Sequence, residues 1–380
     1  MWQERIRPAA GARESSEREE GPLEPTAFSE DSVASIRASL LRWYDSERRD
    51  LPWRRTRDPY AIWISEVMLQ QTQVPRVAPY WERFLDRFPT AADLASASED
   101  DVLAAWSGLG YYRRARFLHR AAGVVTERHG GRLPATAREL AELPGMGDYT
   151  AAAVASIAFG EAVAVIDANV VRGLSRILGI RADPSRGEAR RALRAAASAL
   201  VDPERPGDFN QAMMELGSEI CVPRSPRCAE CPVSAFCAAI KSGHPERYPA
   251  RRAAPKTTEV TEAVAVVSRR GRVLLAPADH ERGWWKGLWI PPRGPMRACE
   301  SAAGVLARQL SDRFGLECAF EGEPRTFRYS ITRHRVRATV LEATLVRGRL
   351  SRSSGGRWFR PEELPGAAVP APYRRVLPVS

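Results

Sequence analysis

Apolar residues recur at intervals of three and four from Ser32 to about Gly243, separated by short loops rich in Gly, Pro and Asp. This spacing is typical of amphipathic helices that bury one face. No strong strand pattern precedes the cysteines. The clearest helical stretches are Val33–Tyr44, Ile62–Phe84, Asp100–Trp106, Thr150–Phe159 and Ala189–Leu200. We therefore expect a mainly α domain over residues 30–243.

The pattern changes after residues 244–258, HPERYPARRAAPKTT, which have the composition of a linker. Two apolar runs, Val260–Val267 and Arg272–Ala276, have the length and composition of strands, and Arg333–Leu345 alternates between polar and apolar residues. Between them, Ser301–Phe314 has helical spacing. Residues 259–380 are therefore predicted to form a smaller α+β domain. Residues 1–29 are polar and rich in Glu, Arg, Ser and Pro, which predicts a disordered tail.

Length, charge and cysteine content narrow the class of protein. A chain of 380 residues is long enough for two cores. Its net charge of +11 favours a polyanionic partner such as nucleic acid, although a genome that encodes Arg in place of Lys would also raise it. No apolar run reaches the length of a membrane span, and the N-terminus lacks the apolar core of a signal peptide. We therefore expect a protein of a reducing compartment, cytoplasmic and associated with the nucleoid.

Four of the six cysteines form one cluster with the spacing C-x6-C-x2-C-x5-C: Cys221, Cys228, Cys231 and Cys237. Four thiolates within so short a segment can surround one metal centre, and both zinc and a [4Fe-4S] cluster accept four cysteines. Zinc ribbons usually pair two C-x2-C motifs, and this chain has one. The spacing instead resembles the cluster loop of the endonuclease III superfamily of DNA glycosylases, where the cluster braces the fold.

A Gly-x-Gly turn, Gly145 to Gly147, joins two predicted helical stretches. Backbone N–H groups at the start of the second helix suit a phosphate oxygen, which makes the turn a candidate DNA contact. Asp167 follows an apolar stretch about twenty residues later. It has the position of a helix N-cap, and a capping carboxylate can also face a pocket.

Five segments in one order resemble the MutY-type adenine DNA glycosylases, which belong to the helix-hairpin-helix superfamily of endonuclease III. They are WISEVMLQQTQV from Trp63, GLGYYRRAR from Gly108, the hairpin LPGMGDYTAAAVASIAFG, VIDANVVR from Val165, and the cysteine spacing. The resemblance runs from about Arg42 to Cys237 and is weaker in the C-terminal domain. It implies a helix-hairpin-helix glycosylase domain with a [4Fe-4S] loop, followed by a Nudix-like domain.

The resemblance implies that Glu66 protonates adenine N7 and that Asp167, kept ionised, stabilises the cationic sugar. The residues agree with that assignment, because Glu66 shares a helix face with Ile62 and Leu69. Loss of solvent among apolar neighbours raises a carboxyl pKa, so that it holds a proton near neutral pH. A salt-bridged surface Glu is the alternative. Two carboxylates in opposite protonation states follow the chemistry of glycosidases.

Further site residues are carried over by motif. Tyr149 stands where the lyase branch of the superfamily has its Schiff-base lysine, so we expect hydrolysis without dedicated strand cleavage. Tyr149 and Asn169 are expected to line the pocket beside the carboxylates. Trp53 and Tyr111 remain open to interpretation as plain core aromatics. The expected contacts to the flipped adenine are Trp53, Arg54 and Glu215; those to the DNA and the gap are Gln71, Thr72, Tyr111, Gly145 and Gly147.

The C-terminal domain contains the frame of a Nudix box, which runs from Gly294 past Glu300 to Leu316. Gln309 and Arg313 replace two of its metal-binding glutamates, so diphosphate hydrolysis is not expected. The resemblance then implies an inactive Nudix-like domain that reads 8-oxoguanine on the opposite strand. Where the family has Phe-Ser-His for that purpose, this chain has Ile331-Thr332-Arg333. Thr332 keeps a hydroxyl in the place of the serine and Ile331 can still intercalate, whereas Arg333 is not a simple replacement for the histidine.

These observations predict a monofunctional adenine DNA glycosylase of base-excision repair, a monomer acting on duplex DNA with adenine opposite 8-oxoguanine or guanine. Three alternatives stay open at this point. One is another mismatch glycosylase of the same fold, such as a thymine–guanine enzyme. The others are a catalytically silent iron–sulfur DNA-binding module and a Nudix hydrolase with a helical appendage.

Overall fold

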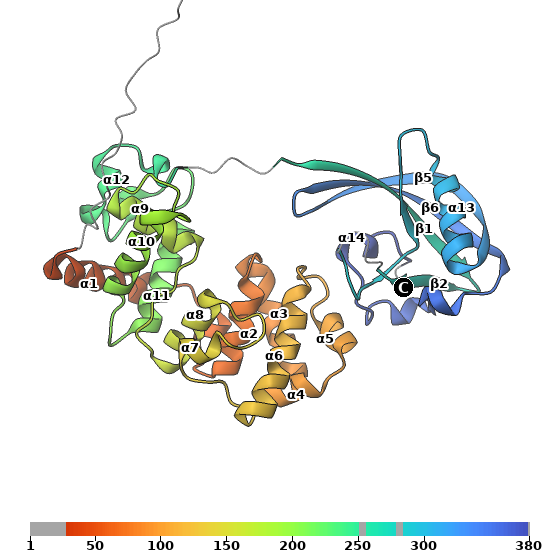
Figure 1. Ribbon diagram of the computed structural model, residues 1–380. Coiled ribbons are helices and arrows are strands. Elements are labelled where there is room, and N and C mark those ends of the chain that lie inside the picture. The colour runs from red at the N-terminus through yellow and green to blue at the C-terminus, as the bar shows by residue number, and fades with distance from the viewer. Residues whose placement is uncertain (1–27, 251–255, 279–283, 379–380) are drawn as a thin grey trace, which may run out of the picture.

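The structure is a computed structural model that describes residues 28–250, 256–278 and 284–378. Almost all of the tail predicted at residues 1–29, and residues 251–255 of the predicted linker, lie outside these ranges. Helices dominate before residue 243, and the described strands all follow residue 257 (Figure 1). No helix in the described ranges is both long enough and apolar enough to cross a membrane.

The first domain is helical throughout its described length. Its α-helices are α1 (Glu30–Glu47), α2 (Pro59–Leu69), α3 (Val74–Arg87), α4 (Ala91–Ser96), α5 (Glu99–Ala105), α6 (Arg113–His129), α7 (Ala137–Leu140), α8 (Asp148–Phe159), α9 (Ala168–Leu178), α10 (Gly187–Leu200), α11 (Pro206–Glu215) and α12 (Ala238–Lys241). A π-helical turn, Leu216–Ile220, continues α11 toward the cysteines.

Two hydrophobic cores divide this domain into lobes. One lobe contains α2 to α8 and buries Trp63, Phe84 and Trp106. The other contains α1 and α9 to α11 and buries Leu40 and Phe209. The chain passes from the first core to the second between α8 and α9, so the start of α9 lies at the boundary between them.

Local sequence explains why α2 is a fixed platform. Asp58 accepts hydrogen bonds from the N–H groups of Tyr60 and Ala61 at the N-terminus of the helix, and Pro59 occupies its first position, where a missing N–H costs nothing. The next nine residues, 60–68, are all buried. A helix that is apolar on every side must lie inside the protein. Any polar group on α2 is therefore held in a defined, solvent-poor place.

The prediction of one continuous helical stretch at Ile62–Phe84 is wrong. The stretch is broken into α2 and α3 by residues 70–73, where Gln71 has a φ of 58°. The apolar spacing continues across the break because both helices face the same core. Pro75 occupies the first turn of α3, where a proline is tolerated, and there it starts the new helix.

The second domain is built on a twisted sheet with strand order β3-β2-β1-β6-β5; β4 also pairs with β1, and β7 with β2. The strands are β1 (Thr258–Arg269), β2 (Arg272–Pro277), β3 (Trp289–Ile290), β4 (Arg293–Pro295), β5 (Leu316–Ile331), β6 (His334–Gly348) and β7 (Arg357–Phe359). β1 and β6 are parallel, and the other pairs are antiparallel. Helix α13 (Ala302–Gln309) covers one face, and α14 (Ala371–Arg374) packs on the other.

Strands β5 and β6 form a long hairpin that reaches from the second domain toward the first (Figure 1). Its end is the turn between Ile331 and His334. Contacts below the hairpin hold the domains together: the Ser107 hydroxyl donates to the carbonyl of Val369 at 3.2 Å and accepts from Arg374 at 3.0 Å. Leu288 and Ala368 join the core of the first lobe. The hairpin end is therefore held at a fixed place relative to the helices.

Candidate functional site

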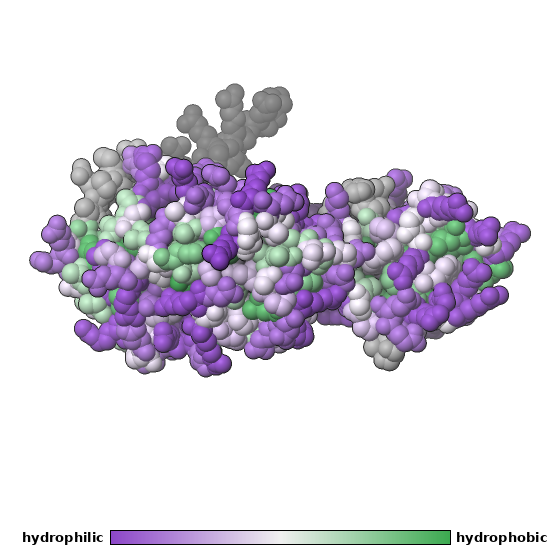
Figure 2. Space-filling view, turned by 90° about the horizontal axis from the view of Figure 1, so that it is seen from below, coloured by the Kyte–Doolittle hydropathy of each residue, from purple (hydrophilic) through white to green (hydrophobic). Residues whose placement is uncertain are grey.

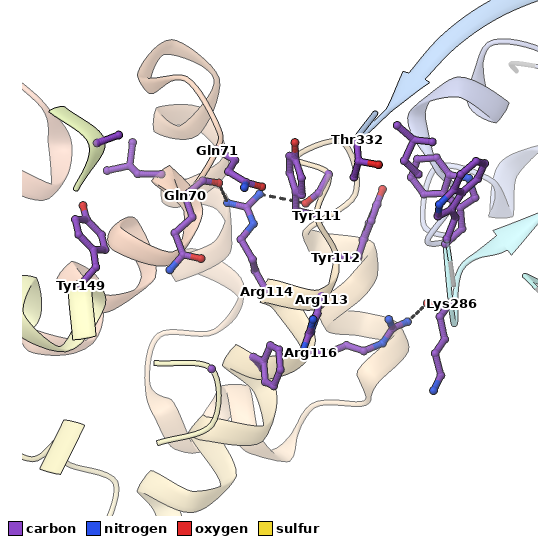
Figure 3. Close-up of a pocket in the computed structure, with 18 of the residues that line it drawn as sticks. Gln70, Gln71, Tyr111, Tyr112, Arg113, Arg114, Arg116, Tyr149, Lys286 and Thr332 are labelled. Atoms are coloured by element: carbon purple, nitrogen blue, oxygen red, sulfur yellow. Dashed lines mark hydrogen bonds between the residues drawn. The ribbon is translucent and has the colours of Figure 1, made fainter. Parts of the chain in front are cut away.

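A cavity of about 1030 Å³ lies between the two domains. Its walls come from the end of α2, the loop before α6, the turn before α8, the start of α9 and the end of the β5–β6 hairpin. Of the sequence-predicted site residues, seven line it: Gln71, Tyr111, Gly145, Tyr149, Asp167, Ile331 and Thr332. Figure 3 shows Gln71, Tyr111 and Thr332 approaching one another from three segments far apart in the sequence.

Glu66 lies directly behind the cavity wall. Its side chain is 5% exposed, and the hydroxyl of Tyr149, which lines the cavity, donates a hydrogen bond to Glu66 Oε2 at 2.8 Å. Burial raises the pKa of Glu66 to about 7, and the negative charge of Asp167 adds to that rise, while the Tyr149 hydrogen bond opposes it. A carboxyl in this state holds a proton at neutral pH and can release it to a bound group.

Asp167 caps α9 and faces the cavity at the same time. Oδ1 accepts from the backbone N–H of Val170 at 2.7 Å, and Oδ2 accepts from the side-chain amide of Asn169 at 2.9 Å. Burial raises the pKa of Asp167, but the N–H donors and the charge of Arg172 oppose the rise. Because N–H groups stabilise an anion, this carboxylate is better suited than Glu66 to remain charged.

Asn169 is held from its other side by Arg172, whose guanidinium donates to the Asn169 amide oxygen at 2.8 Å and to the Cys221 carbonyl at 2.7 Å. This fixes the amide so that its NH₂ points at Asp167. Asn169 thus supports the carboxylate and is absent from the described cavity lining.

The glycine turn has the geometry of a backbone anion site. Gly145 has a φ of 77°, and a Cβ there would lie 2.4 Å from the Cβ of Phe117, so the position demands glycine. Gly147 is the N-cap residue of α8. Because glycine has no side chain, the first N–H groups of the helix have no side-chain cap.

Three residues expected to contact adenine lie away from the cavity lining. Trp53 is 6% exposed and packs edge-on against Trp81, as its alternative interpretation as a core aromatic requires. Glu215 is 1% exposed and forms ion pairs with Arg54 and Arg49, which lower its pKa despite the opposing effect of burial. Contact of these side chains with adenine stays a prediction.

Thr72 and Arg333 also lie outside the main cavity. Thr72 lines a neighbouring cavity of about 290 Å³ between the domains, and its hydroxyl accepts from Arg114 at 3.0 Å. Arg333 is exposed in the turn of the β5–β6 hairpin, beside Thr332, whose φ is 50°. A β-branched residue rarely adopts that conformation, so the turn is strained where it meets the cavity.

The four clustered cysteines form no disulfide, and they lie close enough for their charges to act on one another. Burial, together with the charges of Cys221, Cys237 and Cys228, raises the pKa of Cys231 to about 12. Arg176 donates to Cys221 Sγ at 3.2 Å, and backbone N–H groups donate to the sulfurs of Cys231 and Cys237. Among the described residues, no three metal-ligating side chains converge on a single-ion site. An all-thiolate donor set that receives N–H hydrogen bonds fits an iron–sulfur cluster.

Residues of the Nudix-box frame make structural contacts within the second domain. Glu300 pairs with Arg308 at 2.7 Å, and Arg313 donates to the carbonyl of Pro277 at 3.0 Å. A Cβ on Gly294 would lie 2.7 Å from Val305, so the glycine serves the close approach of β4 to α13.

Residues that sequence reasoning missed also line the cavity. Arg114 and Arg116 lie within the quoted GLGYYRRAR motif, but nothing in the spacing showed that they face the site. Trp285 and Lys286 come from the second domain, and Arg116 donates to the Lys286 carbonyl across the domain boundary. Contacts of this kind depend on how the domains dock, which periodicity does not report.

Three family matches cover most of the described chain. Residues 64–198 match the "HhH-GPD superfamily base excision DNA repair protein", residues 263–378 match the "NUDIX domain", and residues 221–237 match the "Iron-sulfur binding domain of endonuclease III". The first two confirm the predicted fold class of both domains. The third confirms the predicted iron–sulfur cofactor.

Curated relatives extend over both domains. An adenine DNA glycosylase of Mycolicibacterium smegmatis is 44% identical over 294 residues, covering 75% of this chain and 96% of the relative. The human adenine DNA glycosylase is 46% identical over 289 residues, covering 72% of this chain and 52% of that protein. The chain spans about half the length of the eukaryotic relatives it matches. A solved thermostable thymine-DNA glycosylase is 32% identical with a TM-score of 0.51, covering 56% of this chain and 98% of that one.

Proposed function

This chain belongs to the adenine DNA glycosylase family, and from that premise we propose that it hydrolyses the N-glycosidic bond of adenine mispaired with 8-oxoguanine or guanine, leaving an abasic site. The observation that carries the proposal is the pair of acids at the cavity. Glu66 is buried with a pKa of about 7, while Asp167 is held by N–H donors. Their environments separate a proton donor from an anion.

In this proposal Glu66 gives its proton to N7 of the flipped adenine. Protonation turns the base into a better leaving group, so the C1′–N9 bond breaks with the electron pair going to the base. The Tyr149 hydroxyl, 2.8 Å from Glu66, orients the carboxyl toward the cavity that both residues adjoin. Proton transfer by a positioned acid of matched pKa typically contributes about 10²–10⁴ in rate.

Asp167 then stabilises the positive charge that develops on the sugar. Its two oxygens are each held by a hydrogen bond, so the charge is in place before the reaction begins and needs no rearrangement. Water completes the hydrolysis. Tyr149 occupies the hairpin position of the lyase lysine, and a phenol does not form a Schiff base, which supports hydrolysis without strand cleavage.

The DNA contacts follow from the walls of the cavity. Gln71 and Tyr111 would fill the gap left by the extruded adenine, and the Gly145–Gly147 turn would hold a phosphate. Ile331, Thr332 and Arg333, at the end of the β5–β6 hairpin, would contact the base opposite. Hydrophilic residues cover most of the face seen in Figure 2, and the chain's net charge of +11 suits a phosphate backbone.

The remaining predictions about the site complete this proposal. Cys221, Cys228, Cys231 and Cys237 would hold the [4Fe-4S] cluster, which when bound braces the second lobe. Trp53, Arg54, Glu215 and Thr72 would support the adenine and the DNA from behind the cavity wall. The domains are residues 30–243 and 259–380, with 244–258 between them. The protein would work as a monomer at the nucleoid in a reducing compartment.

Single-turnover excision tests the proposal. The substrates are duplexes with one adenine opposite 8-oxoguanine, one adenine opposite guanine, and one thymine opposite guanine. Native protein, Glu66→Gln and a matched Glu161→Gln are compared; Glu161 is hydrogen-bonded to the backbone of Ala137, outside the cavity. Adenine release that survives in Glu161→Gln and is lost in Glu66→Gln supports the proposal. Release of thymine alone would favour the second candidate, a thymine–guanine enzyme, as the thymine-DNA glycosylase relative suggests. Release of neither base by the native protein would overturn the proposal that it is a glycosylase.

A further inference from the structure

Two exposed residues at the mouth of the cavity have unusual backbone conformations. Gln71 has a φ of 58° and Tyr111 a φ of 47°. Neither is glycine, and the left-handed region is unfavourable for a residue that carries a Cβ. The two belong to different loops, one between α2 and α3 and the other before α6. Strain at two such places persists only where the surroundings enforce it.

One side chain, Arg114, contacts the backbone on both loops. Its Nη1 donates to the carbonyls of Val67 and Met68 at 2.9 and 2.8 Å, and to the carbonyl of Gln70. Its Nη2 donates to the Thr72 hydroxyl at 3.0 Å and to the Gly110 carbonyl at 3.1 Å. The guanidinium therefore contacts the residues before and after Gln71 and the residue before Tyr111.

The chemistry of the contact requires arginine. The last carbonyls of α2 have no partner within the helix, and a planar guanidinium can satisfy several at once. Arg114 is 9% exposed, and its charge lies over the rings of Trp106 and Tyr111, at 5.3 and 5.5 Å from their centroids. Lysine carries the same charge, but its single ammonium group cannot reach both loops in the same fork.

We propose that Arg114 is a positioning residue that holds Gln71 and Tyr111 in the conformations in which they enter the duplex, and so determines base extrusion. The inference rests on the proposed function of the cavity. In the free protein the two side chains already converge beside Thr332 of the second domain (Figure 3). Preorganised groups avoid an ordering cost when DNA binds.

The chain offers a matched control. Arg37 donates to the carbonyls of Leu200, Ala199 and Val201, at 3.1, 2.9 and 2.6 Å, around the C-terminus of α10. Like Arg114, Arg37 caps the last carbonyls of a helix with its guanidinium, but it does so in the second lobe. Arg37→Lys therefore reports what loss of such a cap does to the fold, without altering the cavity.

The experiment uses the full chain with its cluster. Duplexes carry 2-aminopurine in place of the target adenine, opposite guanine, and its fluorescence reports unstacking. Extrusion is measured with Glu66→Gln, which cannot donate the proton, and excision of adenine is measured in the otherwise native chain. We expect Arg114→Lys to lose most of the fluorescence rise and to excise about tenfold to hundredfold more slowly, as displacement of positioning groups does. Arg37→Lys should retain both signals.

Two further readings separate positioning from other roles. The pH midpoint of excision should stay unchanged in Arg114→Lys, because Glu66 keeps its surroundings. A shifted midpoint with normal fluorescence would overturn the inference, as would native behaviour of Arg114→Lys. If Arg114→Lys does not fold, Thr72→Val serves instead, because it removes one acceptor of the guanidinium. Thr72→Val should lose part of the fluorescence rise. A fluorescence rise equal to that of the native residue would overturn the inference. Absence of excision by native protein would count against the proposed function instead.

Discussion

Glu66→Gln should make the protein more stable at neutral pH while abolishing its activity. Glutamine has the shape of glutamate, retains an oxygen for the Tyr149 hydroxyl and carries no charge. One pKa unit corresponds to about 1.4 kcal/mol, so a rise from 4.5 to about 7 makes the ionised Glu66 cost about 3 kcal/mol of folding free energy at pH 8. The variant does not pay that cost.

The pH dependence has a definite sign. The folded-state pKa of Glu66 is raised, so the folded protein binds its proton more tightly than the unfolded chain does. Native protein is therefore most stable, as far as this group matters, below pH 4.5 and loses that stability as the pH rises to about 7. The stability advantage of Glu66→Gln should be small at pH 4.5 and reach its full size near pH 8.

Urea unfolding of the full chain at pH 5, 7 and 8 measures the difference. Titrating groups that do not interact with Glu66 cancel between native protein and variant. Glu215→Gln is the contrasting control. Its ion pairs with Arg54 and Arg49 lower the pKa of Glu215, so the stability it contributes is present at neutral pH and lost toward acid. A native protein as stable as Glu66→Gln at pH 8, or a difference that grows toward pH 5, would refute the reasoning about Glu66.

Three other predictions follow from single contacts. Tyr149→Phe removes the hydrogen bond that lowers the Glu66 pKa, so the alkaline midpoint of single-turnover excision should rise by about one unit; a fall would contradict the assignment. Cys231→Ser should lose the visible absorbance of the cluster and lower the melting temperature, whereas Cys299→Ser, at an exposed thiol outside the cluster, should change neither. Ser107→Ala removes two hydrogen bonds between the domains, so the preference for 8-oxoguanine over guanine should fall while adenine excision opposite guanine persists; an unchanged ratio would show that docking does not matter.

The helical domain was predictable because its apolar spacing is regular and its chemistry lies in contiguous motifs. Glu66 lies on α2, a helix that is apolar on nearly every side. The apolar pattern left a salt-bridged surface Glu open, the resemblance favoured a buried acid, and the structure buries the side chain. The sequence likewise predicted Asp167 as a helix cap, because the carboxylate precedes an amphipathic turn. Local pattern and tertiary role coincide at both positions.

Other features depend on contacts between distant segments. The break at Gln71 is held by Arg114, more than forty residues away, so a window of apolar spacing reads α2 and α3 as one stretch. Strand β5, Leu316–Ile331, was missed because much of it is exposed and irregular pairing between Glu321 and Arg325 disturbs the alternation. Trp285 and Lys286 reach the cavity only through docking of the second domain.

The near-absence of lysine limits the covalent chemistry open to the product of the proposed reaction. The chain has three lysines, at positions 241, 256 and 286, and all lie in the described ranges. Among the described residues lining the cavity, Lys286 alone carries an amine. An abasic sugar presents an aldehyde, so any imine between the product and a side chain of this cavity has to form at Lys286. That residue lies on the second domain, away from the helix-hairpin-helix segment that carries the lysine of the lyases.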